Sequence, residues 1–127
     1  MKTRVIIAGS RGFNDYALLK RKLNELLDFD NDITIISGTA NGADSLGEKF
    51  AYEYDLKLIK MPANWAMHGK GAGYIRNEQM AVYASKQNGK LIAFWDGESK
   101  GTVHMIKLAR KYNLEVKVIF YKEEKNE

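Results

Sequence analysis

Cysteine is absent from this sequence, and proline occurs only once, at Pro62. The lack of cysteine excludes a disulfide framework, a thiolate metal site and a cysteine nucleophile, and it suits a reducing compartment. Long apolar runs are also missing, since no stretch approaches the roughly 20 residues that a membrane-spanning helix requires. The basic N-terminus leads into an apolar stretch of strand length, without the pattern of a secretory signal peptide. We therefore expect a cytoplasmic protein with no membrane partner.

The composition is that of a folded globular domain. Of 127 residues, 45% are hydrophobic and 11% aromatic, which is enough for a hydrophobic core. Neither internal repeats nor linker-like segments interrupt the chain, so we expect a single domain over residues 1–121 and a charged tail over 122–127. The formal net charge of +4 favours anionic partners only mildly, because surface lysines are commonly just solvated.

Short apolar runs alternate with stretches in which apolar residues recur at helical spacing. Strands are predicted at Val5–Ala8, Ile33–Ile36, Leu56–Met61, Leu91–Trp95 and Val116–Tyr121. Helices are predicted at Tyr16–Leu27, Ala43–Tyr54, Ile75–Ser85 and Thr102–Tyr112, with a long glycine-rich loop over Pro62–Gly73. This alternation predicts an α/β fold of the Rossmann-like, doubly wound class, in which a five-stranded parallel sheet carries helices on both faces.

Charged residues indicate the order of the strands. The first, second and fourth strands are almost free of charge, as is typical of strands covered on both faces. The third and fifth strands carry Lys57, Lys60 and Lys117, and lysine commonly protects an edge strand. The predicted order is therefore 3-2-1-4-5, in which the chain reverses direction between strands one and four. Ligands of such sheets bind at this switch point, beyond the C-terminal ends of the strands.

Three glycine-rich loops, at residues 9–12, 37–44 and 96–102, lie at this rim, and each leads into a helix. Glycine lets backbone N–H groups approach a phosphate closely, while helix N-termini, hydroxyls and the arginine fork favour its negative charge. Strand-to-helix turns often need glycine for conformation alone, but three such loops together predict a phosphate site. Neither a Walker loop nor a Gly-x-Gly-x-x-Gly fingerprint is present. The residues expected to bind are Gly9, Ser10, Arg11, Gly38, Thr39, Gly42, Gly97, Gly101 and Thr102.

A fourth segment, residues 62–77, combines glycine with aromatic residues and is of a kind that closes over ligands. Trp65 offers a face on which a base could stack, although a tryptophan packed on the rim of the sheet is at least as common. Arg76 and Asn77 are expected to open a helix, where a cation meets the unfavourable end of the helix dipole. A bound anion would offset the repulsion between the cation and the helix dipole, and exposure to solvent would weaken the same repulsion. We include all three side chains in the predicted site.

The acidic and histidine residues do not form an obvious catalytic or metal-binding pattern. Asp44 and Asp96 are the carboxylates best placed near the rim, and each is expected either to contact the ligand or to cap the helix that follows it. His68 and His104 lack metal-ligand spacing and a nearby carboxylate cluster, so we interpret both as surface residues. We expect neither a metal ion nor a cofactor, and we assign no catalytic residue.

Four motifs follow one another along the chain, and together they are specific. They are Gly9-Ser10-Arg11-x-Phe13, Gly38-x-Ala40-x-Gly42-Ala43-Asp44, Trp65-x-x-x-Gly69-Lys70-x-Ala72-Gly73-x-x-Arg76-Asn77-x-x-Met80 and Gly97-x-x-x-Gly101-Thr102. From Val5 to about Ala109 the chain resembles the SLOG superfamily, a Rossmann-like group that contains the Smf/DprA proteins and the cytokinin-activating LOG enzymes. The small YspA/YpsA-related branch is the most similar.

The resemblance implies binding of a nucleotide or a nucleotide derivative. In LOG enzymes an arginine followed four residues later by methionine opens a helix, as Arg76 and Met80 are expected to do here. Their phosphate-binding motif also supplies a catalytic glutamate, and the matching position in this chain is Met105. A thioether can neither transfer a proton nor stabilise an oxocarbenium-like centre as a carboxylate does. The resemblance therefore implies a retained phosphate loop and argues against hydrolysis of the LOG type.

Three functions remain open at this stage. The first is a binding module for a phosphorylated, nucleotide-derived ligand, acting as a sensor, carrier or sequestering protein. The alternative is a phosphoribohydrolase that cleaves the N-glycosidic bond of a nucleoside 5′-monophosphate, using Asp44, Asp96 or Glu98. The third is binding of single-stranded DNA, which we do not favour because the lysines are dispersed rather than aligned in a basic groove. We also expect a homo-oligomer, since so small a domain builds a deep pocket more easily with a second copy.

Overall fold

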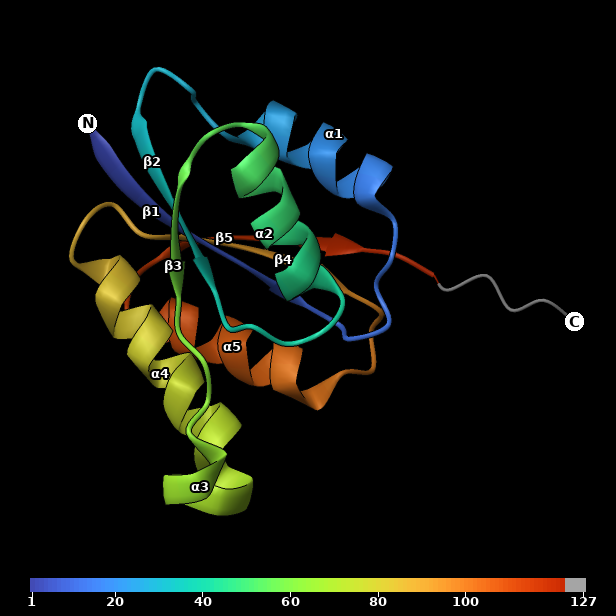
Figure 1. The fold of residues 1–127 in the computed structure, drawn as a ribbon, viewed down its shortest axis with the longest axis vertical. Helices are drawn as coiled ribbons and strands as arrows, with labels where there is room; N and C mark the ends of the chain where they lie inside the picture. Colours follow the sequence, from blue (N-terminus) through green and yellow to red (C-terminus); the bar gives the residue numbers. More distant parts are fainter. Residues whose placement is uncertain (123–127) are drawn as a thin grey trace, which may run out of the picture.

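The structure is a computed structural model in which residues 1–122 are described (Figure 1). Its strands are β1 (Lys2–Gly9), β2 (Asp32–Ser37), β3 (Lys57–Lys60), β4 (Lys90–Trp95) and β5 (Glu115–Phe120). Its helices are α1 (Tyr16–Leu26), α2 (Ala43–Glu53), α3 (Trp65–His68), the 3₁₀ turn η1 (Gly69–Gly71), α4 (Ala72–Ser85) and α5 (Lys100–Lys111). Strands and helices therefore alternate along the described chain, as the sequence predicts.

The five strands form one sheet in the order β3-β2-β1-β4-β5. Every pairing is parallel, with Val5 of β1 opposite Ile35 of β2 and Ile7 opposite Ile92 of β4. This confirms both the predicted fold class and the predicted strand order. The edge strands β3 and β5 carry Lys57, Lys60 and Lys117, whose charged side chains remain in contact with solvent. The inner strands β1 and β4 carry lysine only at their first residues, Lys2 and Lys90. β1 and β4 lie side by side, so their C-terminal ends flank the predicted switch point.

Helices cover both faces of the sheet (Figure 1). Alternate side chains of a strand point to opposite faces, so Val5 and Ile7 of β1 pack with α1 and α2, whereas Ile6 and Ala8 pack with α4 and α5. The first core includes Phe13, Leu19, Leu23, Phe50 and Phe94, and the second includes Ile36, Met80, Leu91, Met105 and Ile106. Both cores are apolar, and together they fix the loops at the C-terminal rim of the sheet.

Local signals account for most helix ends. Asp15 caps α1 by accepting a hydrogen bond from the N–H of Leu18 at 3.0 Å. After α5 the chain turns through Asn113 in the left-handed conformation, with φ of 61°. Asparagine tolerates this conformation better than most residues, so it suits the end of the helix.

The segment 62–73 differs from the predicted loop. Its middle forms α3 and η1, and α4 begins at Ala72 instead of near Ile75. The Asn64 side chain caps α3 by accepting from the N–H of Met67 at 3.1 Å. The loop prediction was wrong because glycine weakens a helix without excluding short turns. In Figure 1, α3 projects at the end of the molecule farthest from β2.

The expected single domain over residues 1–121 stays a prediction. Of the predicted tail 122–127, only Lys122 belongs to the part of the chain that the structure describes. No helix among the described residues is both long enough and apolar enough to cross a membrane.

Candidate functional site

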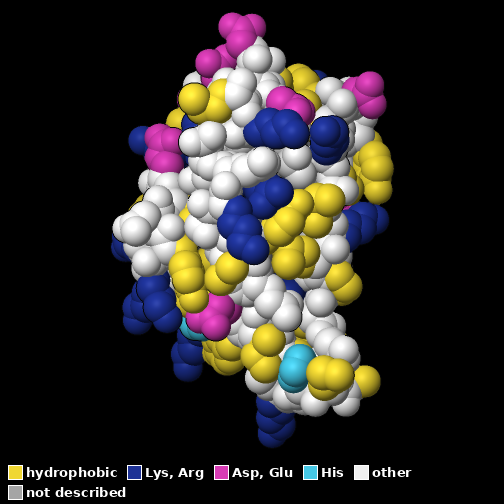
Figure 2. Space-filling model, turned by 90° about the vertical axis from the view of Figure 1, so that its left-hand side faces the viewer, with side chains coloured by type: hydrophobic (Ala, Val, Ile, Leu, Met, Phe, Trp, Pro, Cys, Tyr) yellow, Lys and Arg dark blue, Asp and Glu magenta, His cyan; other side chains and the backbone are white. Residues whose placement is uncertain are grey.

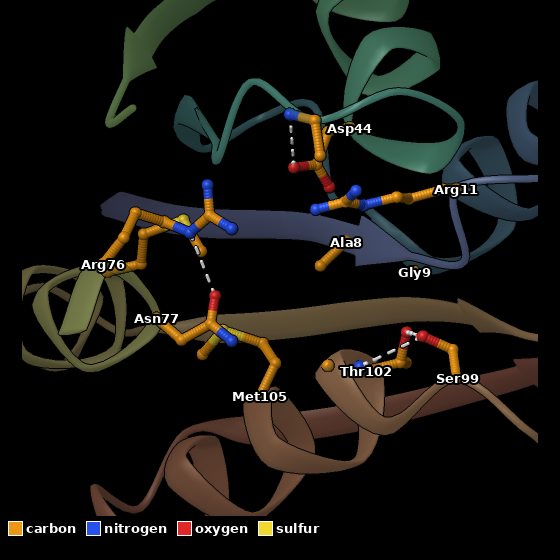
Figure 3. Close-up of a pocket in the computed structure, with 12 residues that line it drawn as sticks. Ala8, Gly9, Arg11, Asp44, Arg76, Asn77, Ser99, Thr102 and Met105 are labelled. Atoms are coloured by element: carbon orange, nitrogen blue, oxygen red, sulfur yellow. Dashed lines mark hydrogen bonds between the residues drawn. The ribbon is translucent and has the colours of Figure 1, made fainter. Parts of the chain in front are cut away.

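A small hollow opens where the C-terminal ends of β1 and β4 meet (Figure 3). Its volume is about 90 Å³, and residues from β1, α2, α4 and α5 and from the loops between them surround it. This is the switch point that the strand order predicts, so the position of the hollow follows from the topology of the sheet. The side chains that give it chemical character are Arg11, Asp44, Arg76, Asn77, Thr102 and Met105.

Arg76 enters the hollow from the second turn of α4. Its Nη1 donates to the backbone carbonyl of Gly38, and its Nε donates to the Asn77 side-chain oxygen at 3.0 Å. A side chain at Gly38 would place its Cβ 2.8 Å from Arg76 Nη1 and 2.9 Å from Asp44 Oδ2. Glycine at this position therefore permits the close approach of the arginine.

The helix-dipole argument for Arg76 was wrong in its premise. α4 begins at Ala72, so the guanidinium belongs to the second turn and does not stand at the first turn of the helix. The pKa of the Arg76 guanidinium is shifted instead by the groups around it. Burial and the nearby Arg11 both lower the pKa of Arg76, while Asp44 opposes them. Partial desolvation beside a second cation is a stronger reason to expect an anion here than the dipole was.

Asp44 is 5% exposed and lies in the first turn of α2. Its carboxylate accepts from the N–H of Ala40 at 3.1 Å, which lies before the helix, and Gly42 occupies the cap position. Asp44 therefore does not cap α2 and instead braces the loop that precedes it. Burial raises the pKa of Asp44 to about 6, against the opposing effects of the Ala40 hydrogen bond, Arg76 and Arg11.

The loop between β2 and α2 is held from both of its ends. Ser37 donates its hydroxyl to Glu48 at 2.6 Å and accepts from the N–H of Thr39 at 3.0 Å. Thr39 has a φ of 65°, a left-handed conformation that is uncommon for a β-branched residue. Gly42 has a φ of 77° and lies against the backbone of Ser10 and Arg11, where a Cβ would clash. These constraints set the Gly38 carbonyl and Asp44 in place beside Arg76.

Arg11 reaches the hollow from the loop after β1, on the side opposite Arg76 (Figure 3). The two guanidiniums extend toward the same space from two different elements of the chain. Each guanidinium has five N–H donors in a planar fork that matches phosphate oxygens. The arrangement can therefore bind an anion between two forks.

The loop between β4 and α5 closes the hollow below. The Asp96 carboxylate accepts from the N–H groups of Glu98 and Ser99, both at 2.9 Å, and these bonds lower its pKa. Ser99, not Asp96, caps α5, since its hydroxyl accepts from the N–H of Thr102 at 3.4 Å. The Thr102 hydroxyl donates to the same Ser99 oxygen at 3.0 Å. Capping of α5 was one of the two roles expected of Asp96, and that expectation was wrong. Asp96 instead forms an Asx turn, and the cap is Ser99, three residues later.

Apolar side chains line the remainder of the central hollow. Met105 and Met80 are 1% and 2% exposed, and both also belong to the core beneath the sheet. The Met105 side chain therefore both lines the hollow and packs in the hydrophobic core. A thioether there offers contact area and polarisability but no proton.

Two further hollows adjoin the central one, and both are lined by Arg11 and Arg76. One measures about 500 Å³ and lies among the Gly38–Asn41 loop, Pro62 and Trp65. The other measures about 210 Å³ and lies among Trp65, Lys70 and Tyr74. We call the first the Trp65–Thr39 hollow and the second the Trp65–Tyr74 hollow.

The structure gathers most of the predicted site residues at these hollows. Those that line one or more of them are Gly9, Arg11, Gly38, Thr39, Asp44, Trp65, Arg76, Asn77, Gly101 and Thr102. Those that lie outside the three hollows are Ser10, Gly42, Asp96 and Gly97. Ser10 is buried and accepts from the N–H of Asp96 at 3.1 Å, so it joins the loops after β1 and β4.

Sequence reasoning missed several contacts at the site. His104, interpreted as a surface residue, lies with its Nδ1 3.2 Å from the Asn77 amide and packs edge-on against the Tyr74 ring at 4.5 Å. Partial burial lowers its pKa. Ser99 was missed because serine is common in loops, and only its spacing of three residues before Thr102 marks it as a cap.

No group of three or more histidine, aspartate or glutamate side chains within residues 1–122 is arranged to hold a metal ion. The chemistry of the site is thus carried by guanidinium, amide, hydroxyl and backbone donors and by one buried carboxyl group.

The model of the YspA, cpYpsA-related SLOG family matches residues 3–68, which include Arg11, Gly38 and Asp44. Arg76, Asn77 and Thr102 lie beyond the matched segment. The chain is also 30% identical over 119 residues to the Gene 61 protein of Mycobacterium phage D29, covering 89% of this chain and 93% of that protein.

Among solved structures, the DNA processing protein A (DprA) of Streptococcus pneumoniae has a similar fold, with a TM-score of 0.69 and 15% sequence identity. The match covers 93% of this chain but spans half the length of DprA. At this identity the likeness shows the Rossmann-like fold alone. The family match and the phage relative go further: the chain belongs to the YspA, cpYpsA-related SLOG family.

Proposed function

We propose that this protein binds a phosphorylated, nucleotide-derived ligand and that it acts as a sensor, carrier or sequestering protein. The observation that carries the proposal is the pair Arg11 and Arg76, whose guanidiniums converge on one hollow at the switch point of the sheet (Figure 3). Two cations placed side by side repel each other. Burial is the main cause of the lowered pKa of Arg76, and the neighbouring Arg11 adds to it against the opposing effect of Asp44. An anion between the two guanidiniums removes the repulsion and accepts from N–H groups of Arg11 and from those of Arg76 that do not point to Gly38 or Asn77.

Further donors surround the same position. Gly101 and the Thr102 hydroxyl lie at the N-terminus of α5, a helix of 12 residues whose dipole favours negative charge. The Asn77 amide adds a neutral polar group. Asp44 is the opposing feature, and its pKa of about 6 allows it to be protonated when an anion occupies the site. The net character of the hollow is that of a phosphate site.

A second candidate function is hydrolysis of the N-glycosidic bond, and a specific observation favours it. Of the three carboxylates considered for it, Asp44 lines the central hollow, whereas Asp96 is engaged by backbone N–H groups and Glu98 is exposed. A pKa near 6 suits a general acid or base at neutral pH. Met105, however, offers no carboxylate at the position where LOG enzymes have one.

Isothermal titration with nucleoside monophosphates, combined with an assay for free base, tests both candidates. We expect saturable binding and no base release by the wild-type protein. Release of base that is lost in Asp44→Asn would instead establish the hydrolase. Absence of binding to every phosphorylated nucleoside, with the fold intact, would contradict the proposed function.

A further inference from the structure

We infer that the ligand is a dinucleotide, in which a phosphodiester or pyrophosphate group between two nucleosides lies at Arg11 and Arg76. This inference rests on the proposed function and adds to it the class of the ligand. The three hollows indicate that the phosphate lies in the middle of the ligand and not at its end.

The central hollow is too small for a nucleotide. Its volume is about 90 Å³, well below the roughly 300–1,000 Å³ of sites that enclose a small-molecule ligand. It is bounded by both arginines, Asn77 and Thr102, which are donors that suit phosphate oxygens, and by Met80 and Met105. The hollow thus has room for a phosphate group, and the nucleoside must lie outside it.

Two further hollows lie next to it, and each is large enough to hold part of a nucleoside. The Trp65–Thr39 hollow measures about 500 Å³ and the Trp65–Tyr74 hollow about 210 Å³. Arg11 and Arg76 line both of them as well as the central hollow, so a chain of atoms that leads from one flank to the other passes the two guanidiniums. A ligand with a terminal phosphate fills only one flank, whereas a ligand with a central phosphate fills both.

Each flank carries groups that suit a nucleoside. Trp65 lines both flanks and is 54% exposed, so its indole offers surface on which a base can stack. Tyr74 is 51% exposed and is held edge-on by His104, which fixes the orientation of its ring in the second flank. Thr39 and Asn41 supply polar groups to the first flank, and Lys70 and Asn77 to the second.

The surface around α3 agrees with this account. Hydrophobic side chains gather on the projection at the foot of the molecule in Figure 2, where α3 and the start of α4 lie. Trp65, Met67, Tyr74 and Ile75 are all exposed there. Exposed aromatic surface beside the exposed Arg11 and the partly buried Arg76 is typical of sites that bind bases through stacking and phosphate through charge.

The experiment compares a ligand that carries a terminal phosphate with ligands that carry phosphate between two or more nucleosides. Tryptophan fluorescence of Trp95→Phe reports on Trp65 alone, because the sequence contains two tryptophans. The probes are AMP, the dinucleoside phosphate ApA, the pyrophosphate-bridged AppA and a single-stranded oligoadenylate of eight nucleotides. We expect ApA or AppA to bind at least tenfold more tightly than AMP.

Two variants show whether the second nucleoside uses the second flank. Tyr74→Ala should weaken the dinucleotide at least fivefold and change the affinity for AMP less than twofold, because AMP can occupy the first flank. Tyr52→Ala, which removes a tyrosine that is 67% exposed on α2 outside the three hollows, serves as the matched control and should change neither.

The outcomes separate the inference from the proposed function. Equal affinity for AMP and both dinucleotides would overturn the inference while leaving the phosphate site intact. Binding of none of the probes would overturn both. Affinity that rises from ApA to the oligoadenylate would support the two-sided site and identify a nucleic-acid strand as the source of the phosphodiester; equal affinity for ApA and the oligoadenylate would identify a free dinucleotide.

Discussion

Replacing Arg11 by alanine separates ligand binding from folding better than any other change at the site. Arg11 is exposed, and its side chain extends into the space shared by the three hollows. Removing an exposed side chain of this kind changes the free energy of unfolding by no more than about 0.5 kcal/mol. The loss of binding should therefore appear without a loss of structure.

The size of the loss follows from the contact that disappears. A charge-assisted hydrogen bond to phosphate contributes about 1.5–3 kcal/mol, which corresponds to roughly a ten- to hundredfold weaker dissociation constant. Arg76 remains in Arg11→Ala, so binding is weakened without being abolished. The effect should shrink as salt is raised, because the open hollows admit counterions.

Isothermal titration with AMP or ApA measures this change, and urea unfolding of the same variant measures stability. Arg21→Ala is the matched control, since Arg21 is an exposed arginine of α1 outside the three hollows. If both arginine variants weaken binding equally, the effect is one of net charge and the proposed phosphate position is incorrect.

Further changes test the neighbouring groups. Arg76→Ala should weaken binding to a similar degree but also lower the free energy of unfolding by about 1–3 kcal/mol, because the Gly38 carbonyl loses its donor. The Asp44 pKa is raised on folding, so its contribution to stability is fully present below the unfolded value near 3.8 and is lost as pH rises through about 6. Stability measured from pH 4 to 7.5 should therefore fall by about 2–3 kcal/mol more in the wild type than in Asp44→Asn; parallel curves would contradict the assignment. Met105→Glu should destabilise the fold by several kcal/mol in urea, because a carboxylate replaces a core side chain, whereas Met105→Leu should cost less than about 1.5 kcal/mol. A homo-oligomer remains our expectation, and light scattering over a concentration series should give more than the mass of one chain; a constant monomer mass would refute it.

The fold could be predicted because its signals are local and agree with one another. Lysines marked the edge strands, uncharged runs marked the inner ones, and the resulting order placed the site at the switch point before any side chain was considered. The start of α4 at Ala72 could not be predicted, because two glycines precede it, a third follows it, and the cap at Asn64 belongs to a separate short helix.

Most of the residues expected to bind the ligand line the three hollows, and their assignment to a binding site stays a prediction, whereas their contacts could not be predicted. Arg76 was identified for a reason that the structure does not support, and its actual partner, the Gly38 carbonyl, is 38 residues away in the sequence. His104 and Asn77 are 27 residues apart and meet only because α4 and α5 pack side by side. Contacts of this kind depend on the tertiary arrangement, for which spacing along the chain carries no signal.

The position of the phosphate between the two arginines is tested most directly by NMR of the arginine Nε–H groups, titrated with ApA and with inorganic phosphate. The signals of Arg11 and Arg76, assigned from the two alanine variants, should shift together along one saturable curve while that of Arg21 stays fixed. Saturable binding that leaves the Arg11 and Arg76 signals unchanged would contradict the account.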